Sequence, residues 1–311
     1  MHVAEPDEVR LDCQSPFDGA ALLEFLARRA VAGIEEVVSG TYRRSLRLPH
    51  GAGVVQLTPG QGFVRSRLFL EDERDRDVAV QRCRCLMDLD CDPGAVGEVL
   101  RRDPLMAPSV QASPGRRVPG HVDGDELAAR AVLGQQVSVA GARTLAARLV
   151  VTHGTRLSSP IGGVTHLFPS AAELAALDPQ QLAMPESRKR ALCGLARALA
   201  SGEISLAAGV DPDETARRLL GVPGIGPWTV GYIAMRALHD SDAFLASDLG
   251  VRRALESLGE DGGPRTALRL AESWRPYRAY ATQHLWAMLG PASPASVRTG
   301  SSTTGAGRRR T

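Results

Sequence analysis

Apolar and polar residues alternate along the first ninety positions of the chain, and this alternation predicts β-strands. Strands are expected over residues 37–48, 54–57 and 63–70, with His50-Gly51 and Pro59-Gly60 as the turns between them. Weaker patterns add a strand over residues 8–13 and helices over residues 20–32 and 76–89. The pattern therefore indicates a small antiparallel sheet with helices on one face, an α+β arrangement.

From about residue 93 the apolar spacing changes to three and four residues, which is typical of helices. One short helix is expected over residues 94–102, and a Pro/Gly/Ser-rich run over residues 107–120 marks a boundary. Helical periodicity then continues to residue 290, broken mainly by a loop over residues 152–169. The sequence predicts four parts: an α+β domain (7–92), a short helix with a linker (93–124), a helical domain (125–290) and a disordered tail (291–311).

The composition narrows the classes of function only a little. The chain has 311 residues, of which 43% are hydrophobic, so it can bury a sizeable core without a metal or a disulfide. Its net charge of +2 does not by itself indicate a nucleic-acid partner. No apolar run approaches the length of a membrane-spanning helix, and no apolar signal segment is apparent. We therefore expect a cytoplasmic protein.

Five cysteines bear on the redox compartment and on metal binding: Cys13, Cys83, Cys85, Cys91 and Cys193. An odd number of cysteines without a signal segment is typical of a reducing cytosol. Cys83, Cys85 and Cys91 resemble part of a zinc site, but no fourth ligand follows at a fitting distance along the sequence. Buried thiols on a helix are the favoured interpretation.

The most specific pattern lies between residues 219 and 255. An amphipathic run ends in the sequence GVPGIG at residues 221–226, and a second helical run begins at Pro227. Glycines permit a tight turn, and proline is tolerated in the first turn of a helix. The free N–H groups of such a hairpin bind phosphate. About twenty residues later a lone carboxylate, Asp248, precedes another helical run, so the segment suggests chemistry on a nucleotide.

These residues resemble a known signature. The runs VPGIGPWTVGY (222–232) and DAFLASD (242–248) resemble the helix-hairpin-helix and Gly/Pro-Asp (HhH-GPD) motif of DNA glycosylases, closest to the bacterial 3-methyladenine DNA glycosylase II (AlkA) family. Residues 131–150 and 271–286 are similar to the same family, as is the N-terminal part from about residue 12 to 92. The resemblance implies a TBP-like α+β domain followed by an all-α glycosylase core of two helical subdomains.

Two positions decide which chemistry the resemblance implies. Asp248 matches the family's aspartate, which faces the sugar of a flipped nucleotide and stabilises positive charge or orients water. On local sequence alone an aspartate before a helix is more often an N-cap, and the two roles are compatible. Bifunctional relatives carry a lysine where Trp228 stands, and the only lysine here, Lys189, lies at a distant helix start. The resemblance therefore implies a monofunctional glycosylase without a Schiff-base nucleophile.

The resemblance also implies a base pocket lined by aromatic side chains: Trp228, Tyr232, Trp286 and Phe25. Electron-rich rings stack on N-alkylated purines and attract their positive charge. Spacing alone favours ordinary core aromatics at these positions. Leu249 and Ala287 stand where the family has further aromatics, which implies a roomier pocket and leaves the range of substrates open.

Three further family features fall on the hairpin and on one loop. The DNA-binding hairpin comprises Val222, Pro223, Gly224, Ile225, Gly226 and Thr229. The backbone carbonyls of Leu220, Val222 and Ile225 match positions that hold a monovalent cation in the family. Gln135 and Gln136 interrupt an apolar helical region, and since two adjacent amides are costly to bury, a break is expected there. In the family this loop inserts a side chain into the duplex as a wedge.

The sequence thus predicts a monofunctional DNA glycosylase that excises alkylated bases of the 3-methyladenine and 7-methylguanine type in base excision repair. Its expected partners are damaged double-stranded DNA and, downstream, an abasic-site endonuclease. It is expected to need no cofactor apart from the hairpin cation, and to act as a monomer near the nucleoid. Two alternatives stay open: a glycosylase for uracil or a mismatched base, and a non-catalytic hairpin DNA-binding protein. Because some relatives are fused behind an alkyl-transfer and regulator module, the chain is either free-standing or a fragment of such a fusion.

Overall fold

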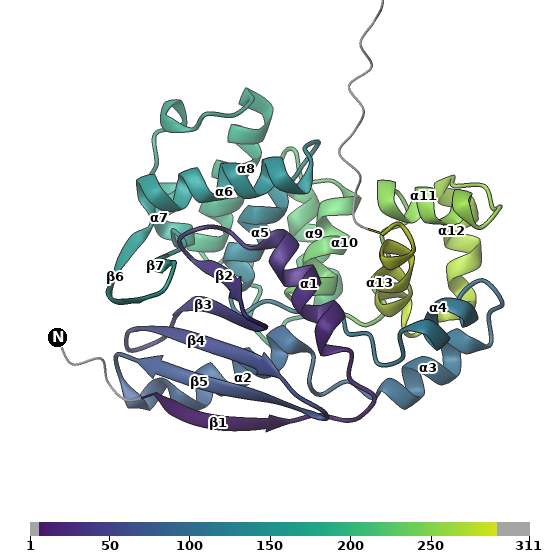
Figure 1. Cartoon of the computed structure of the whole chain (residues 1–311). Coiled ribbons are helices and arrows are strands. Elements are labelled where there is room, and N and C mark those ends of the chain that lie inside the picture. The colour runs from purple at the N-terminus through teal and green to yellow at the C-terminus, as the bar shows by residue number, and fades with distance from the viewer. Residues whose placement is uncertain (1–5, 291–311) are drawn as a thin grey trace, which may run out of the picture.

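The computed structural model describes residues 6–290, whose N-terminal part is built on a five-stranded antiparallel sheet (Figure 1). The strands are β1 (Asp7–Asp12), β2 (Glu35–Val38), β3 (Thr41–Arg47), β4 (Ala52–Pro59) and β5 (Phe63–Leu70), in the spatial order β1-β5-β4-β3-β2. Helices α1 (Gly19–Arg29) and α2 (Arg76–Met87) share one hydrophobic cluster with this sheet. The predicted α+β arrangement is confirmed.

Burial along the strands explains why alternation predicted them. In β5 the side chains of Val64, Ser66 and Leu68 are buried, whereas Arg65 between them is exposed. The first six residues of β4 are all buried, because a second hairpin covers the other face of the sheet. That hairpin consists of β6 (Thr155–Ile161) and β7 (Val164–Leu167). It lies inside the segment for which only a loop was predicted, so that expectation was wrong.

Two other boundaries differ from the predicted ones. The single strand expected over residues 37–48 is two strands, β2 and β3, paired across the turn Ser39-Gly40, whose φ angles are 49° and 73°. Positive φ at both central positions is typical of the tight hairpin turns that match the twist of a sheet. The run expected to be loose after residue 102 contains a short helix, α4 (Ala107–Ala112), in which Pro108 is accommodated in the first turn.

The helical part follows the predicted periodicity. Its helices are α5 (Gly124–Leu133), α6 (Val139–His153), α7 (Ala171–Ala175), α8 (Glu186–Ala200), α9 (Pro212–Gly221), α10 (Pro227–Arg236), α11 (Leu249–Ser257), α12 (Pro264–Ala271) and α13 (Arg278–Met288), with α3 (Pro93–Arg101) preceding them. The break predicted at Gln135-Gln136 is confirmed, since α5 ends at Leu133 and α6 begins at Val139. Three short 3₁₀ turns are also described, over residues 73–75, 179–181 and 272–274.

The core is divided into hydrophobic clusters that meet near α10. One cluster is formed by α5, α6, α8 and the start of α10, and a second by α3, α11, α12 and α13. Tyr232 of α10 packs against both, while Phe25 of α1 packs on the cluster of the N-terminal sheet. Side chains from distant parts of the sequence are therefore brought to one junction.

Three remaining expectations concern the cysteines, the membrane and the tail. Cys83 and Cys85 lie on α2, where Cys83 is buried and Cys85 half-buried, whereas the buried Cys91 follows the helix; the expected buried thiol on a helix is thus confirmed for Cys83. Within residues 6–290 no helix is both long and apolar enough to cross a membrane. The tail predicted to be disordered (291–311) lies outside the described residues.

Candidate active site

Asp248 precedes α11 and caps it, because its Oδ1 accepts a hydrogen bond from the backbone N–H of Val251 at 3.0 Å. The same carboxylate also accepts hydrogen bonds from two indoles. Trp286 Nε1 donates to Oδ1 at 2.8 Å, and Trp228 Nε1 donates to Oδ2 at 2.9 Å. A carboxylate offers about four acceptor positions, so three donors fix Asp248 and leave roughly one position for a ligand.

The four predicted aromatic residues form two stacked pairs beside this carboxylate. Trp228 and Tyr232, one turn apart on α10, stack with ring centres 5.3 Å apart and planes inclined by 10°. Phe25 of α1 and Trp286 of α13 stack at 6.3 Å and 18°. All four rings and Asp248 are half-buried. We call these five residues the aromatic cluster; the structure brings together every residue predicted for the catalytic position and the base pocket.

Gly250 is a residue of this site that the sequence did not single out. A Cβ at this position would lie 2.8 Å from Trp286 Cδ1 and 2.9 Å from Asp248 Oδ1. Real Cβ atoms almost never approach so closely, so only glycine lets the Trp286 indole reach the carboxylate. A glycine two positions after the aspartate is a signal that could have been noticed.

Two arginines that sequence reasoning also missed lie against the aromatic cluster. The guanidinium carbon of Arg29 is 3.7 Å from the centre of the Phe25 ring and 5.7 Å from that of Trp286. The guanidinium carbon of Arg236 is 4.9 Å from the Phe25 ring centre, and its Nη1 donates to the Tyr232 hydroxyl at 2.7 Å. The other hydrogen bonds of Arg236 go to the carbonyls of residues 119 and 120. Among residues 6–290 neither arginine makes an ion pair with a carboxylate.

Burial and charge alter the pKa values of the groups at this end of the cluster. Burial lowers the pKa of Arg29 to about 10; Tyr232 opposes this shift, and the charge of Arg236 adds to it. Burial alone would raise the pKa of the Tyr232 hydroxyl, but the charges of Arg236 and Arg29 outweigh burial and lower it. The guanidinium groups of Arg29 and Arg236 are thus close enough to Tyr232 to alter the pKa of its hydroxyl.

The glycine hairpin between α9 and α10 is tight and rests on α8. Gly224 has φ +89°, and a Cβ there would lie 2.9 Å from the Cβ of Ala191 in α8. Gly226, just before α10, has an ordinary φ of −106°, and an added Cβ would meet nothing within 4 Å. The protein's own backbone and packing therefore require glycine at position 224. At position 226 the protein itself would tolerate a side chain, because an added Cβ would lie in open space.

The two glutamines predicted as the wedge occupy different places. Gln135 donates from Nε2 to the carbonyl of Gly224 at 3.0 Å and to Thr229 Oγ1 at 3.1 Å, so it braces the hairpin. Arg188 of α8 donates to the Gln135 carbonyl at 2.6 Å. Gln136 is exposed and has φ +56°, which turns it outward at the tip of the loop. Thr229, predicted among the DNA-binding hairpin residues, is only 2% exposed and faces Gln135 instead.

The carbonyls predicted to hold a cation differ in how free they are. The carbonyl of Val222 accepts a hydrogen bond from the N–H of Ile225 at 3.0 Å. Within the described chain no hydrogen bond reaches the carbonyls of Leu220 or Ile225. Oxygen ligands are what alkali and other hard cations prefer, so the unbonded carbonyls fit the predicted ion.

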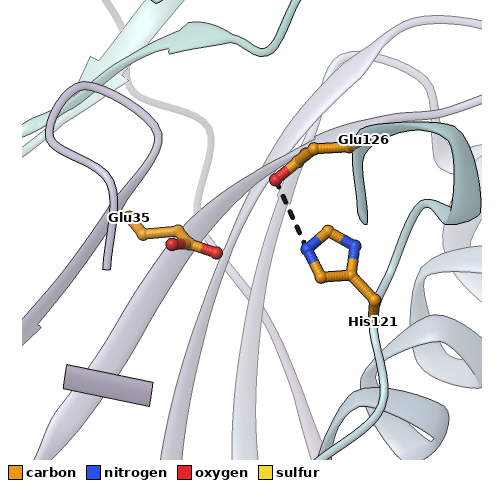
Figure 2. A group of neighbouring side chains, drawn as sticks. All are labelled: Glu35, His121 and Glu126. Atoms are coloured by element: carbon orange, nitrogen blue, oxygen red, sulfur yellow. Dashed lines mark ion pairs between the residues drawn. The ribbon is translucent and has the colours of Figure 1, made fainter. Parts of the chain in front are cut away.

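A second group of side chains, none of them a member of the aromatic cluster, has metal-ligand spacing but is paired with arginines. Figure 2 shows Glu35, His121 and Glu126 pointing toward one another, with their ligand atoms within 4.8 Å. Arg44 and Arg130 each bridge the two glutamates, at 2.7–3.1 Å. Burial raises the pKa of Glu35, but Arg130 and Arg44 reverse this and lower it to about 2. Two guanidinium groups already balance the two carboxylates, so this group is an internal ion-pair network rather than a metal site.

Two basic residues, one of them the single lysine, lie outside the aromatic cluster. Lys189 of α8 pairs with Glu186, with Nζ 3.7 Å from Oε2, and none of the contacts of Asp248 involves it. Arg278 of α13 makes a bidentate ion pair with Asp242 at 2.8 and 2.9 Å, a contact that gives it a structural role.

Sequence comparisons give relatives over nearly the whole chain. Residues 8–123 match the family model described as the AlkA N-terminal domain. The chain is 47% identical over 281 residues to a Mycobacterium tuberculosis protein named "Probable bifunctional transcriptional activator/DNA repair enzyme AlkA", covering 90% of this chain but 57% of that protein. It is 36% identical over 283 residues to the Escherichia coli DNA-3-methyladenine glycosylase 2, covering 89% of this chain and 95% of that protein. The chain thus spans little more than half of the first relative.

Solved structures share the fold. A 3-methyladenine DNA glycosylase from Archaeoglobus fulgidus superposes with a TM-score of 0.78 at 21% identity, over 89% of this chain and 97% of that one. An 8-oxoguanine glycosylase/lyase from Clostridium acetobutylicum in complex with double-stranded DNA gives 0.71 at 18% identity, over 93% and 98%. At these identities the likeness concerns the fold.

Proposed function

The chain belongs to the AlkA family of DNA glycosylases, and we propose that it excises alkylated bases from double-stranded DNA by hydrolysing the N-glycosidic bond. The observation that carries the proposal is the carboxylate of Asp248, held by the indoles of Trp228 and Trp286 inside a cluster of stacked aromatic rings. A cationic alkylated purine stacks well on such rings. The carboxylate supplies the negative charge that bond cleavage requires.

In the proposed reaction the C1′–N bond breaks and its electron pair leaves with the base nitrogen. Positive charge develops on the sugar, and Asp248 stabilises it through the acceptor position that its three donors leave unused. The oxygen of a water molecule then forms the bond to C1′ and releases its proton to solvent or to Asp248. The products are the free base and an abasic site.

The product strand stays intact in this proposal. A lyase needs an amine at C1′, and the position from which bifunctional relatives supply it holds Trp228, whose N–H is bonded to Asp248. Lys189, the single lysine, is paired with Glu186. A separate abasic-site endonuclease is therefore the proposed downstream partner.

The hairpin and the glutamine loop form the proposed DNA contact. The backbone N–H groups of Gly224 and Gly226, which make no hydrogen bond within the described chain, bind phosphate, with a monovalent cation on the Leu220 and Ile225 carbonyls in support. Gln136 is the proposed wedge, since it is exposed at the loop tip while Gln135 braces the hairpin. A Gln136→Ala enzyme that excises a base from duplex DNA at the unaltered rate would refute the wedge assignment.

Base release from a panel of duplexes tests the proposed function. We expect free base from duplexes carrying 3-methyladenine or 7-methylguanine and none from the undamaged duplex. Duplexes with uracil or a mismatched base belong in the panel, because Leu249, next to Asp248, is 56% exposed and leaves the edge of the site open. Release of uracil alone would replace the alkylated-base proposal, and tight duplex binding without any release would favour the non-catalytic alternative.

A further inference from the structure

Arg29 and Arg236 stand out because no carboxylate in the described chain neutralises them. The molecule contains a direct contrast: Arg44 is as deeply buried as Arg236 (1% and 4% exposed), yet Arg44 is paired with Glu35 and Glu126. Burying a charge without a partner is costly. The hydrogen bonds of Arg236 go to two backbone carbonyls and to the Tyr232 hydroxyl, which fix its position but do not balance its charge.

These charges lie on the aromatic cluster, and each is nearest to a ring that Asp248 does not bind. Asp248 accepts hydrogen bonds from Trp228 and Trp286, one ring of each stacked pair. Arg236 lies 5.6 Å from the ring centre of Tyr232 and 4.9 Å from that of Phe25, the other ring of each pair. Arg29 lies 3.7 Å from the Phe25 ring centre. Each pair therefore has a carboxylate at one ring and a guanidinium at the other.

The charge that develops on a departing base suggests a role for this arrangement. When the C1′–N bond breaks, its electron pair goes to the base nitrogen. An N-alkylated cationic purine becomes neutral in this step, so its departure creates no negative charge that has to be stabilised. An uncharged base becomes an anion, and a guanidinium near it stabilises that charge in the transition state. The Tyr232 hydroxyl accepts from Arg236 and keeps its own proton free to donate to an oxygen or nitrogen of such a base.

We propose that Arg29 and Arg236, with the Tyr232 hydroxyl, are specificity-determining residues that stabilise the negative charge of departing uncharged bases and so extend base release beyond cationic lesions. The inference rests on the proposed glycosylase function. A phosphate of the DNA is the other anion that could meet these guanidinium groups. The base is favoured, because both arginines lie against rings of the cluster rather than on the hairpin or the glutamine loop.

The test compares two duplexes under single-turnover conditions, one with 7-methylguanine (cationic) and one with hypoxanthine (uncharged, with an exocyclic oxygen). Arg29→Met keeps an unbranched apolar side chain beside Phe25 but removes the guanidinium charge that lies over the ring. We expect release of hypoxanthine to fall roughly tenfold or more and release of 7-methylguanine to change much less, since that base leaves uncharged. Arg29→Lys keeps the charge and should restore most of the hypoxanthine rate.

Arg28→Met is the matched control. Arg28 is the adjacent residue in the sequence, but its guanidinium is exposed and pairs with Glu24 instead of contacting the aromatic cluster. It should leave the ratio of the two rates unaltered. An equal fall of both rates in Arg29→Met, as a phosphate contact or a structural role would produce, overturns the proposal. So does a wild-type enzyme that releases 7-methylguanine but no hypoxanthine. Failure to release 7-methylguanine would instead contradict the glycosylase function itself.

Discussion

Asp248 combines two roles in one side chain because its two oxygens have different neighbours. Oδ1 caps α11 through the N–H of Val251 and also meets the Trp286 indole, while Oδ2 meets the Trp228 indole. The cap and the two indoles orient the carboxylate before any nucleotide arrives. Preorganised charge of this kind is more effective in catalysis than a side chain that must reorient.

Asp248→Asn should lower the rate of base excision about 10²–10³-fold, the usual effect of losing one group that stabilises transition-state charge. The single oxygen of asparagine can keep the contacts of Oδ1, but its NH₂ group then faces the N–H of Trp228, donor against donor. Single-turnover kinetics, duplex affinity and thermal unfolding measure the three consequences separately.

Asp92→Asn is the matched control for that variant, because Asp92 caps α3 in the same way, by accepting from the backbone N–H groups of Gly94 and Ala95. It should reproduce the small loss of stability from an altered cap and leave excision unaffected. An Asp248→Asn enzyme within a few-fold of the wild-type rate would remove Asp248 from the mechanism.

Among single residues, the sequence predicted those that belong to a recognisable motif. Asp248, Trp228 and Tyr232 follow the hairpin at fixed spacing, so the motif identified them. Gly250 and Arg236 were missed, since their roles depend on close approach of atoms from α13 and α1. No local pattern reveals such an approach.

Among the elements, three meet at the proposed DNA contact. The hairpin rests on α8 where Gly224 meets Ala191, and the glutamine loop is tied to both elements. Gln135 supplies these ties, through its side chain to the Gly224 carbonyl and through its own carbonyl to Arg188. A change at any one of these positions should therefore disturb the others.

Substitutions at the two hairpin glycines distinguish an effect on folding from an effect on DNA binding. Gly224→Val should destabilise the protein, because valine avoids φ +89° and its Cβ would press on Ala191. Gly226→Val should fold normally, because its φ is ordinary and nothing lies within 4 Å, but it should weaken binding to damaged and undamaged duplexes alike. Thermal unfolding and duplex titration over a range of salt measure both effects.

A folded Gly226→Val protein with unaltered duplex affinity and salt dependence would show that the hairpin does not bind phosphate. The dependence of affinity on salt should become less steep with each phosphate that the variant no longer neutralises. Full stability of Gly224→Val would contradict the packing of the hairpin on α8.

Element types were predictable where one periodicity runs without interruption, as in β5 and α6. The errors fell where a short feature interrupts a longer pattern. Two residues with positive φ, Ser39 and Gly40, divide one alternating run into two strands. The hairpin β6–β7 is stabilised by Ala52 and Val54 of the distant sheet, so its own sequence carries little signal.

In the whole molecule, the buried ion pairs join the sheet to the helical part. Glu35 and Arg44 belong to β2 and β3, and Glu126 and Arg130 belong to α5. Arg130 also donates to the backbone carbonyl of Arg29 at the end of α1. The network therefore holds the N-terminal contribution to the aromatic cluster against the helices.

Glu126→Gln should destabilise the protein by about 3–5 kcal/mol at pH 7, because it leaves buried guanidinium charge partly unpaired. Burial opposes the charged form of Glu126, but Arg44, His121 and Arg130 hold its folded pKa well below the usual range. Its stabilising effect is thus present above the unfolded pKa and lost as the pH falls through the folded one. Urea unfolding from pH 7 downward should show wild type and variant converging in acid.

Glu98→Gln removes the partner of an exposed ion pair with Arg102 and serves as the control, with little expected effect. Equal stability of Glu126→Gln and Glu98→Gln at pH 7 would show that the buried network does not secure the junction.

The most direct test of the proposed hydrolytic mechanism is the state of the DNA strand after the base has been released. We predict that incubation with alkylated duplex yields free base and an intact strand carrying an abasic site, which breaks only after added alkali. Borohydride should trap no covalent adduct, because Trp228 occupies the position of the lyase amine and water attacks C1′ beside Asp248. Strand cleavage without alkali, or a trapped enzyme–DNA adduct, would contradict this mechanism and assign the chemistry to an amine nucleophile.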